Sequence, residues 1–150
     1  KTTQMTKYIS IDPGKYKCGL IFADFDSKTI HNAIVIESQL LVQYIKNIKE
    51  NHQNIKVIMG NGTSSKEHAY SLRFLGENLL LAEEKNTTFR AKQRYFEIHP
   101  IKGLRRFLPK DVLLYNVNLD AVAALIILED FLNFKFAYNC DRLSKTWLKQ

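Results

Sequence analysis

The amino-acid sequence predicts an α/β fold with a mixed five-stranded sheet and helices on both faces. Three strand-like runs separated by short turns come first, and they indicate an antiparallel meander. Helical periodicity then alternates with short apolar runs, which is typical of β-α-β units that cross over a sheet. At 150 residues we expect one domain, with a core from about 8 to 134 and terminal extensions at 1–7 and 135–150.

The meander is predicted from three runs rich in β-branched and apolar residues. They are Tyr8–Asp12, Cys18–Ala23 and Thr29–Ile36. The dipeptide Pro13-Gly14 marks a tight turn between the first two runs. Cys18 lies inside an apolar strand, and we expect it to be a small buried hydrophobic residue.

After the third run, the spacing of apolar residues changes, and stretches with helical spacing alternate with short apolar runs. In order, we expect a helix from Leu40 to Ile48, a strand at Ile55–Met59, a helix from Thr63 to Leu75, a strand at Leu79–Ala82, helices at Thr87–Ile98 and Ile101–Leu108, and a helix at Leu119–Phe134. Three of the helices begin at side chains suited to N-capping: Ser38 for the first, Thr63, Ser64 or Ser65 for the second, and Asn86, Thr87 or Thr88 for the third. The last helix is apolar from Ala121 to Leu128, so most of its circumference must be buried.

Three acidic residues stand at the ends of predicted elements. Asp12 ends the first strand, Glu84 follows the last strand, and Asp120 opens the last helix. Functional groups of α/β sheets gather at the carboxyl ends of the parallel strands, so these carboxylates are expected to converge. Hard cations such as Mg²⁺ or Mn²⁺ prefer oxygen ligands, and two such ions can support phosphodiester hydrolysis. The three acids are therefore candidate metal ligands and catalytic residues.

Each acid also has a purely structural interpretation. Asp12 can hydrogen-bond the Pro13-Gly14 turn as an Asx-type residue. Glu84 can favour the positive start of the following helix or pair with Lys85. Asp120 can interact with free N–H groups at its own helix start. The residue types alone do not choose between these interpretations and a metal site.

Basic charge is concentrated in one window of the chain. The net charge is +7, and basic residues between Lys85 and Asp111 are opposed only by Glu97 and Asp111. These basic residues are Lys85, Arg90, Lys92, Arg94, Lys102, Arg105, Arg106 and Lys110. The pattern favours a polyanionic partner such as nucleic acid, and the alternative is a solvated face of scattered charge.

Two segments offer additional phosphate contacts. The loop Gly60-Asn61-Gly62-Thr63 leads into a helix, and the N–H groups at Asn61 and Thr63 could cradle a phosphate. Thr87 and Thr88 precede Arg90 and Arg94 on the next helix and could bind the same backbone. A helix needs a start in any case, so the loop alone is a weak signal.

Five motifs, in order, resemble the YqgF/RuvX family of RNase H-like nucleases. They are Asp12-Pro13-Gly14 with Cys18-Gly19-Leu20, Met59-Gly60-Asn61-Gly62-Thr63-Ser64, Glu83-Glu84-Lys85-Asn86-Thr87-Thr88-Phe89-Arg90-Ala91, Pro100-Ile101-Lys102-Gly103-Leu104-Arg105-Arg106, and Leu119-Asp120-Ala121-Val122-Ala123-Ala124. The resemblance implies an RNase H-like fold, related to RuvC, with Asp12, Glu84 and Asp120 as catalytic acids. Family members are described as Holliday junction resolvases or as nucleases that process the 5′ end of pre-16S rRNA.

The chain departs from the family pattern at two places. Glu83-Glu84-Lys85 stands where the family has Asp-Glu-Arg, so a point charge replaces a guanidinium fork. At the start of the last helix, Asp120 is the single acid, where relatives often have two. The alternative function is therefore a catalytically weak or inactive RNase H-like nucleic-acid-binding protein.

The expected function is that of a Mg²⁺- or Mn²⁺-dependent nuclease acting on branched DNA or precursor rRNA. A resolvase needs two active sites, which implies a homodimer. No signal peptide or membrane helix is recognisable, so we expect a cytoplasmic protein. Asp12-Pro13-Gly14 also resembles the phosphate turn of actin/Hsp70-type ATPases and sugar kinases, but those need two such domains.

Overall fold

The computed structural model of the protein describes residues 6–114 and 117–137. Its elements, in chain order, are β1 (Lys7–Asp12), β2 (Lys17–Asp24), β3 (Thr29–Glu37), η1 (Ser38–Leu40), α1 (Leu41–Asn51), β4 (Lys56–Gly60), α2 (Ser65–Ser71), η2 (Arg73–Asn78), β5 (Leu79–Ala82), α3 (Thr87–Ile98), η3 (Gly103–Phe107), α4 (Lys110–Leu113) and α5 (Asp120–Leu132). The expected terminal extensions lie largely outside the described residues.

The five strands form one mixed sheet in the order β3-β2-β1-β4-β5. β1, β2 and β3 pair antiparallel, whereas β4 pairs parallel with β1 and β5 pairs parallel with β4. The predicted meander followed by β-α-β units is therefore confirmed. β1 is the central strand, and its residues from Tyr8 to Ile11 are all buried because both faces of the sheet are covered there.

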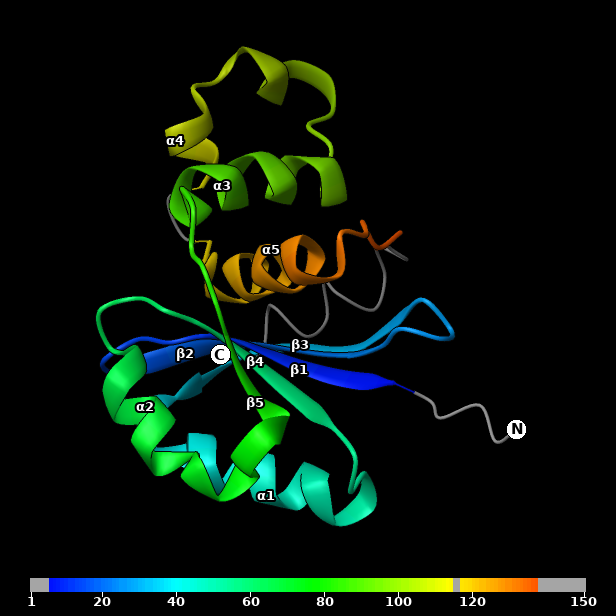
Figure 1. Ribbon diagram of the computed structural model, residues 1–150. Helices are drawn as coiled ribbons and strands as arrows, with labels where there is room; N and C mark the ends of the chain where they lie inside the picture. Colours follow the sequence, from blue (N-terminus) through cyan, green and yellow to red (C-terminus); the bar gives the residue numbers. More distant parts are fainter. Residues whose placement is uncertain (1–5, 115–116, 138–150) are drawn as a thin grey trace.

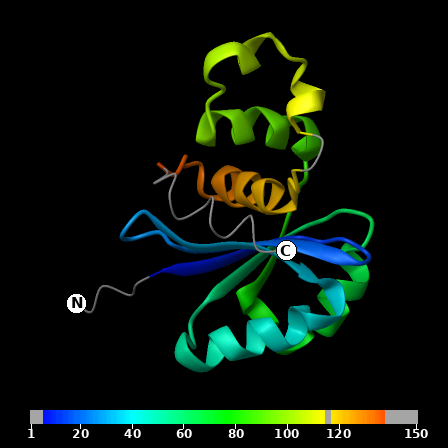
Figure 2. The ribbon, with the colours of Figure 1, turned by 180° about the vertical axis from the view of Figure 1, so that it is seen from behind.

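Helices cover both faces of the sheet, as predicted. Figure 1 shows α1 and α2 on one face and α5 on the other, and Figure 2 shows the same layers from behind. One apolar cluster joins Ile11 of β1 to Leu41 of α1. Another joins Ile21 of β2 to Leu125 of α5. α3 packs on α5 rather than on the sheet, so this side of the molecule has an additional layer (Figure 1).

α5 is enclosed between the sheet and α3. Every residue from Ala121 to Leu128 is buried, which confirms the prediction from its apolar sequence. Ser10 of the central strand donates a hydrogen bond of 2.6 Å to the Ala124 carbonyl and ties α5 to β1. No helix within 6–114 and 117–137 is both long and apolar enough to cross a bilayer.

The predicted N-caps are only partly right. Ser38 does not cap α1, because it begins the short helix η1 and its hydroxyl donates to the Gly14 carbonyl instead. Ser64 and Asn86 do hold the N-cap positions of α2 and α3, but neither side chain makes a capping hydrogen bond. Asn86 has φ 51°, a left-handed conformation that Asn tolerates better than most residues.

Candidate functional site

The candidate site lies at the edge where β1, β4 and β5 end. Asp12 is the last residue of β1, Gly60 is the last residue of β4, and Glu84 follows β5 by two positions. Asp120 is the first residue of α5. Both ribbon views place the β1–β2 turn, the loop after β4 and the start of α5 on the same side of the molecule (Figures 1 and 2). We call this region the acidic edge, defined by Asp12, Glu84 and Asp120.

Two glycines make room for the side chain of Glu84. A Cβ atom on Gly60 would overlap the Glu84 carboxylate, and a Cβ atom on Gly62 would lie only 2.8 Å from its Oε2 atom. The Glu84 side chain therefore lies directly against the end of β4, the strand next to β1. The backbone N–H of Glu84 donates to Oδ1 of Asn61 at 3.2 Å, which fixes the start of the segment after β5.

A third glycine brings the start of α5 onto the sheet. Gly19 of β2 pairs with Asp12 in the antiparallel ladder. A Cβ atom on Gly19 would overlap the backbone carbonyl of Asp120. The first turn of α5 thus contacts the sheet beside Asp12, and the sequence signal for this close approach is a glycine within an otherwise apolar strand.

The three carboxyl groups are electrostatically linked. Burial raises the pKa of Asp12 from 3.8 to about 7, and the negative charges of Glu84 and then Asp120 add to this rise. Burial also raises the pKa of Glu84, against a backbone hydrogen bond from Gly62. Burial raises the pKa of Asp120 as well, while Lys17 and Asn118 lower it. Such a group of perturbed carboxyls marks a candidate functional site.

The structural interpretation of Asp12 receives no support. Within the described ranges, no hydrogen bond joins the Asp12 carboxylate to the Pro13-Gly14 turn. Other groups hold the turn instead: Ser38 Oγ and His68 Nε2 bond to the Gly14 carbonyl at 2.9 and 2.7 Å. Lys85, which could have paired with Glu84, forms its ion pair with Glu83 at 3.1 Å.

The acidic edge has the chemistry that a hard divalent cation requires. Its donors are carboxylate oxygens, and Oε1 of Glu84 is buried without a hydrogen-bond partner in the described structure. A buried oxygen of this kind is costly unless a cation or a donor satisfies it. As the side chains are placed, no three His, Cys, Asp or Glu residues among those described could already hold one ion. The residues therefore fit a cation by donor type and charge, after rotation of their side chains.

Gly60→Ala tests the packing of Glu84 against β4. We expect the new methyl group to push the flexible Glu84 side chain away from Asp12, because a side chain moves more easily than backbone. The pKa of Asp12 should then fall, and Mn²⁺ affinity should drop at least about 10-fold, the scale of a mispositioned ligand. NMR titration measures the pKa of Asp12, and calorimetry measures the affinity for Mn²⁺. Gln43→Ala, at an exposed position of α1, serves as a control for Mn²⁺ binding. Unchanged values in Gly60→Ala would contradict the arrangement.

The predicted phosphate-binding residues fall into two groups. Thr63, Thr88, Lys102, Arg105 and Arg106 are exposed, as are Asn61 and Lys85, and Thr87 is partly exposed. Arg105, Arg106 and Lys102 lie on or next to η3, which Figure 1 shows beyond α3. The segment also exposes Leu104 and Phe107. We call residues 102–110 the basic arm.

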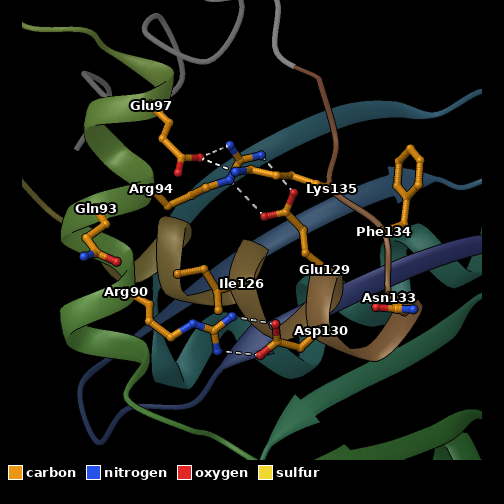
Figure 3. A pocket seen from close by; sticks show the side chains of 10 residues that line it. All are labelled: Arg90, Gln93, Arg94, Glu97, Ile126, Glu129, Asp130, Asn133, Phe134 and Lys135. Carbon is orange, nitrogen blue, oxygen red and sulfur yellow. Dashed lines mark hydrogen bonds and ion pairs between the residues drawn. The ribbon is translucent and has the colours of Figure 1, made fainter.

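Arg90 and Arg94 form the second group, and their guanidinium groups contact acids of α5. Arg90 makes two hydrogen bonds of 2.7 and 2.6 Å to Asp130. Arg94 is buried, and it binds both Glu129 and Glu97 (Figure 3). The nucleic-acid contacts expected of these two arginines stay a prediction, but their charge is already compensated within the protein.

Sequence reasoning missed the residues directly after the first turn. Lys15, Tyr16 and Lys17 are all exposed beside the acidic edge, and Lys17 is close enough to Asp120 to lower the pKa of that carboxyl. The available signal was the tripeptide Lys-Tyr-Lys immediately after Asp12-Pro13-Gly14. An aromatic residue between two lysines is a common composition at nucleic-acid surfaces.

The chain matches no protein-family model and no curated protein.

Proposed function

We propose that this protein is an RNase H-like nuclease that hydrolyses phosphodiester bonds in structured nucleic acid with the help of Mg²⁺ or Mn²⁺. The observation that carries the proposal is the gathering of Asp12, Glu84 and Asp120 at one sheet edge, where burial and then the charges of the other two acids raise the pKa of Asp12 to about 7. Three acids kept together against their mutual repulsion are typical of a cation site. The mixed sheet with β1 at its centre agrees with this assignment.

The roles of the residues follow from their positions. Asp12, Glu84 and Asp120 would hold the cations. The ionisation of Asp12 is influenced by both of the other acids. Bound cations would neutralise the phosphodiester charge and lower the pKa of the attacking water. Lys17 lies next to Asp120 and could contact the phosphate that is cleaved. The buried thiol of Cys18 is compatible with the reducing cytoplasm that we propose as the location.

Cation binding and cleavage test the proposal together. The full chain is titrated with Mn²⁺ by calorimetry and incubated with a four-way DNA junction, a precursor rRNA fragment and a linear duplex. We expect Mn²⁺ to bind and at least one structured substrate to be cut. The absence of both results would overturn the proposal. A homodimer in solution would favour junction resolution, because both strands must be cut, whereas a monomer would favour rRNA processing.

A nucleic-acid-binding protein without nuclease activity is the second candidate. It is favoured by one observation: Lys102, Arg105 and Arg106 of the basic arm are exposed and can bind phosphates without a cation. This candidate predicts salt-sensitive nucleic-acid binding without Mn²⁺ binding. The calorimetric titration therefore separates the two candidates.

Charge reversal in the basic arm tests its role in binding. Arg105→Glu/Arg106→Glu should weaken nucleic-acid binding at least about 10-fold and reduce the salt slope by about 2, because two phosphate contacts are lost. Fluorescence anisotropy at several salt concentrations measures both quantities. Lys46→Glu/Lys56→Glu is the matched control, with the same charge change at exposed positions of α1 and at the start of β4. Equal losses in the two double variants would show a non-specific effect of net charge.

A further inference from the structure

An exposed aromatic ring stands at the β1–β2 turn, beside the acidic edge. Tyr16 is 75% exposed and lies between the exposed residues Lys15 and Lys17. The Lys15 ammonium is 5.3 Å from the centre of the Tyr16 ring. The ring thus has open space around it and positive charge on either side along the chain.

The backbone that carries this ring is held firmly. The Tyr16 carbonyl accepts a 2.8 Å hydrogen bond from the N–H of Ser38, and the Gly14 carbonyl accepts from Ser38 Oγ and His68 Nε2. These bonds connect the turn to η1 and to α2. A ring on a fixed backbone loses little conformational entropy when a ligand binds to it.

The ring is also close to the proposed site of cleavage. Tyr16 follows Asp12 by four positions, so their Cα atoms cannot be farther apart than about 14 Å, the length of four extended residues. Lys17 lies near enough to Asp120 to influence its ionisation. A nucleic acid bound at the acidic edge would therefore extend past Tyr16.

We propose that Tyr16 is a stacking platform for an unpaired base of the substrate, and that Lys15 and Lys17 bind the phosphates on either side of that base. The inference rests on the proposed nuclease function and narrows its substrate class to nucleic acid with an unpaired nucleotide near the cleaved bond. Bases inside a duplex are already stacked on their neighbours, whereas an unpaired base offers its face to an aromatic side chain. Stacking is tolerant of sequence, which suits an enzyme that selects structure.

A second exposed tyrosine provides a matched control. Tyr70 of α2 is 68% exposed, and the guanidinium of Arg73 lies 4.1 Å from the centre of its ring. α2 covers the opposite face of the sheet from α5 (Figure 1). Tyr70 is the second-to-last residue of α2. Tyr70 therefore shares the residue type and exposure of Tyr16 but not its position at the acidic edge.

The test uses Asp12→Asn as the background, so that the substrate stays intact. Two oligonucleotides of the same sequence are prepared in DNA and in RNA: one is fully paired, and the other carries 2-aminopurine as a single unpaired base. We expect quenching of the 2-aminopurine fluorescence on binding. Adding Tyr16→Ala should remove the quenching and weaken binding of the bulged substrate about 5- to 150-fold, with little change for the paired one. Tyr16→Phe should retain both properties, as should Tyr70→Ala.

Each contrary result has its own meaning. Full quenching and affinity in Tyr16→Ala would overturn the stacking role and leave the nuclease proposal intact. An equal loss of affinity for paired and bulged substrates would also overturn the stacking role, because Tyr16 would then contact nucleic acid whether or not a base is unpaired. Tyr16→Leu, which keeps apolar bulk without a ring, provides the same comparison if Tyr16→Ala fails to fold. If the Asp12→Asn protein binds neither oligonucleotide, the proposed function and this inference both fail.

Discussion

Asp12→Asn is expected to abolish cation-dependent cleavage and, at the same time, to stabilise the metal-free protein above pH 7. Activity should fall at least about 100-fold, the scale of losing one preorganised charged group in an active site. Stability should rise because the amide is uncharged, so that its burial costs less and it no longer repels Glu84 and Asp120. A residue that destabilises the fold and is needed for activity has a functional role, which distinguishes this outcome from ordinary structural damage.

The direction of the pH dependence follows from the pKa of Asp12. Burial and the two neighbouring acids raise this pKa from 3.8 to about 7, so the folded state binds a proton more tightly than the unfolded state. Stability of the metal-free protein should therefore fall as the pH rises from about 4 to about 7, and this contribution should not change further above pH 7. The full effect corresponds to at most about 4 kcal/mol, which Asp12→Asn should recover at pH 8.

Urea unfolding in the presence of EDTA, at pH 4 and pH 8, measures this effect. The variant should differ from the wild type at pH 8 and resemble it at pH 4. Glu50→Gln, at an exposed acid of α1, is the control and should have little effect at either pH. Undiminished cleavage by Asp12→Asn would exclude the metal role. Loss of cleavage without a gain in stability at pH 8 would show that burial and the two neighbouring acids do not raise the pKa of Asp12 in solution.

Much of the fold could be predicted because its signals are local. Short β-branched runs, a Pro-Gly turn and a helix that is apolar all round each restrict the backbone or its burial directly. The helix caps were less predictable. The Ser38 hydroxyl does not bond to the backbone of the helix that follows it; it donates to the carbonyl of Gly14, which lies in a turn far away in the sequence. A sequence window around Ser38 contains no information about that turn.

The convergence of the three acids could be predicted from sheet topology, whereas the ion pairs of Arg90 and Arg94 could not be predicted. Asp12, Glu84 and Asp120 each stand at the end of an element, and the topology of a mixed sheet brings such ends together. The net charge of residues 85–111 does not include Glu129 and Asp130, because these acids lie later in the sequence, on α5. Packing of α3 on α5 places Asp130 against Arg90 and Glu129 against Arg94, and only the tertiary structure shows those partners.

Arg94→Met is expected to destabilise the protein by about 3–5 kcal/mol, because it leaves the Glu129 carboxylate without its main partner in a buried position. The two side chains are only 9% and 10% exposed, and Arg94 makes paired hydrogen bonds of 3.0 and 2.9 Å to Glu129. Arg94 also donates to the Phe136 carbonyl, and the Phe136 N–H donates to Glu129, so the loss would loosen the chain after α5. Urea unfolding measures the effect.

Arg90→Met is the matched control, since its ion pair with Asp130 is 38% and 42% exposed and should contribute less than about 1 kcal/mol. The double variant Arg94→Met/Glu129→Leu removes both buried charges and should recover most of the stability lost in Arg94→Met. Nucleic-acid binding by folded Arg94→Met should change little, because the charge of Arg94 is already neutralised by Glu129 and Glu97. A large loss of binding with unchanged stability would instead assign Arg94 to the nucleic-acid surface, as its position in the basic window first indicated.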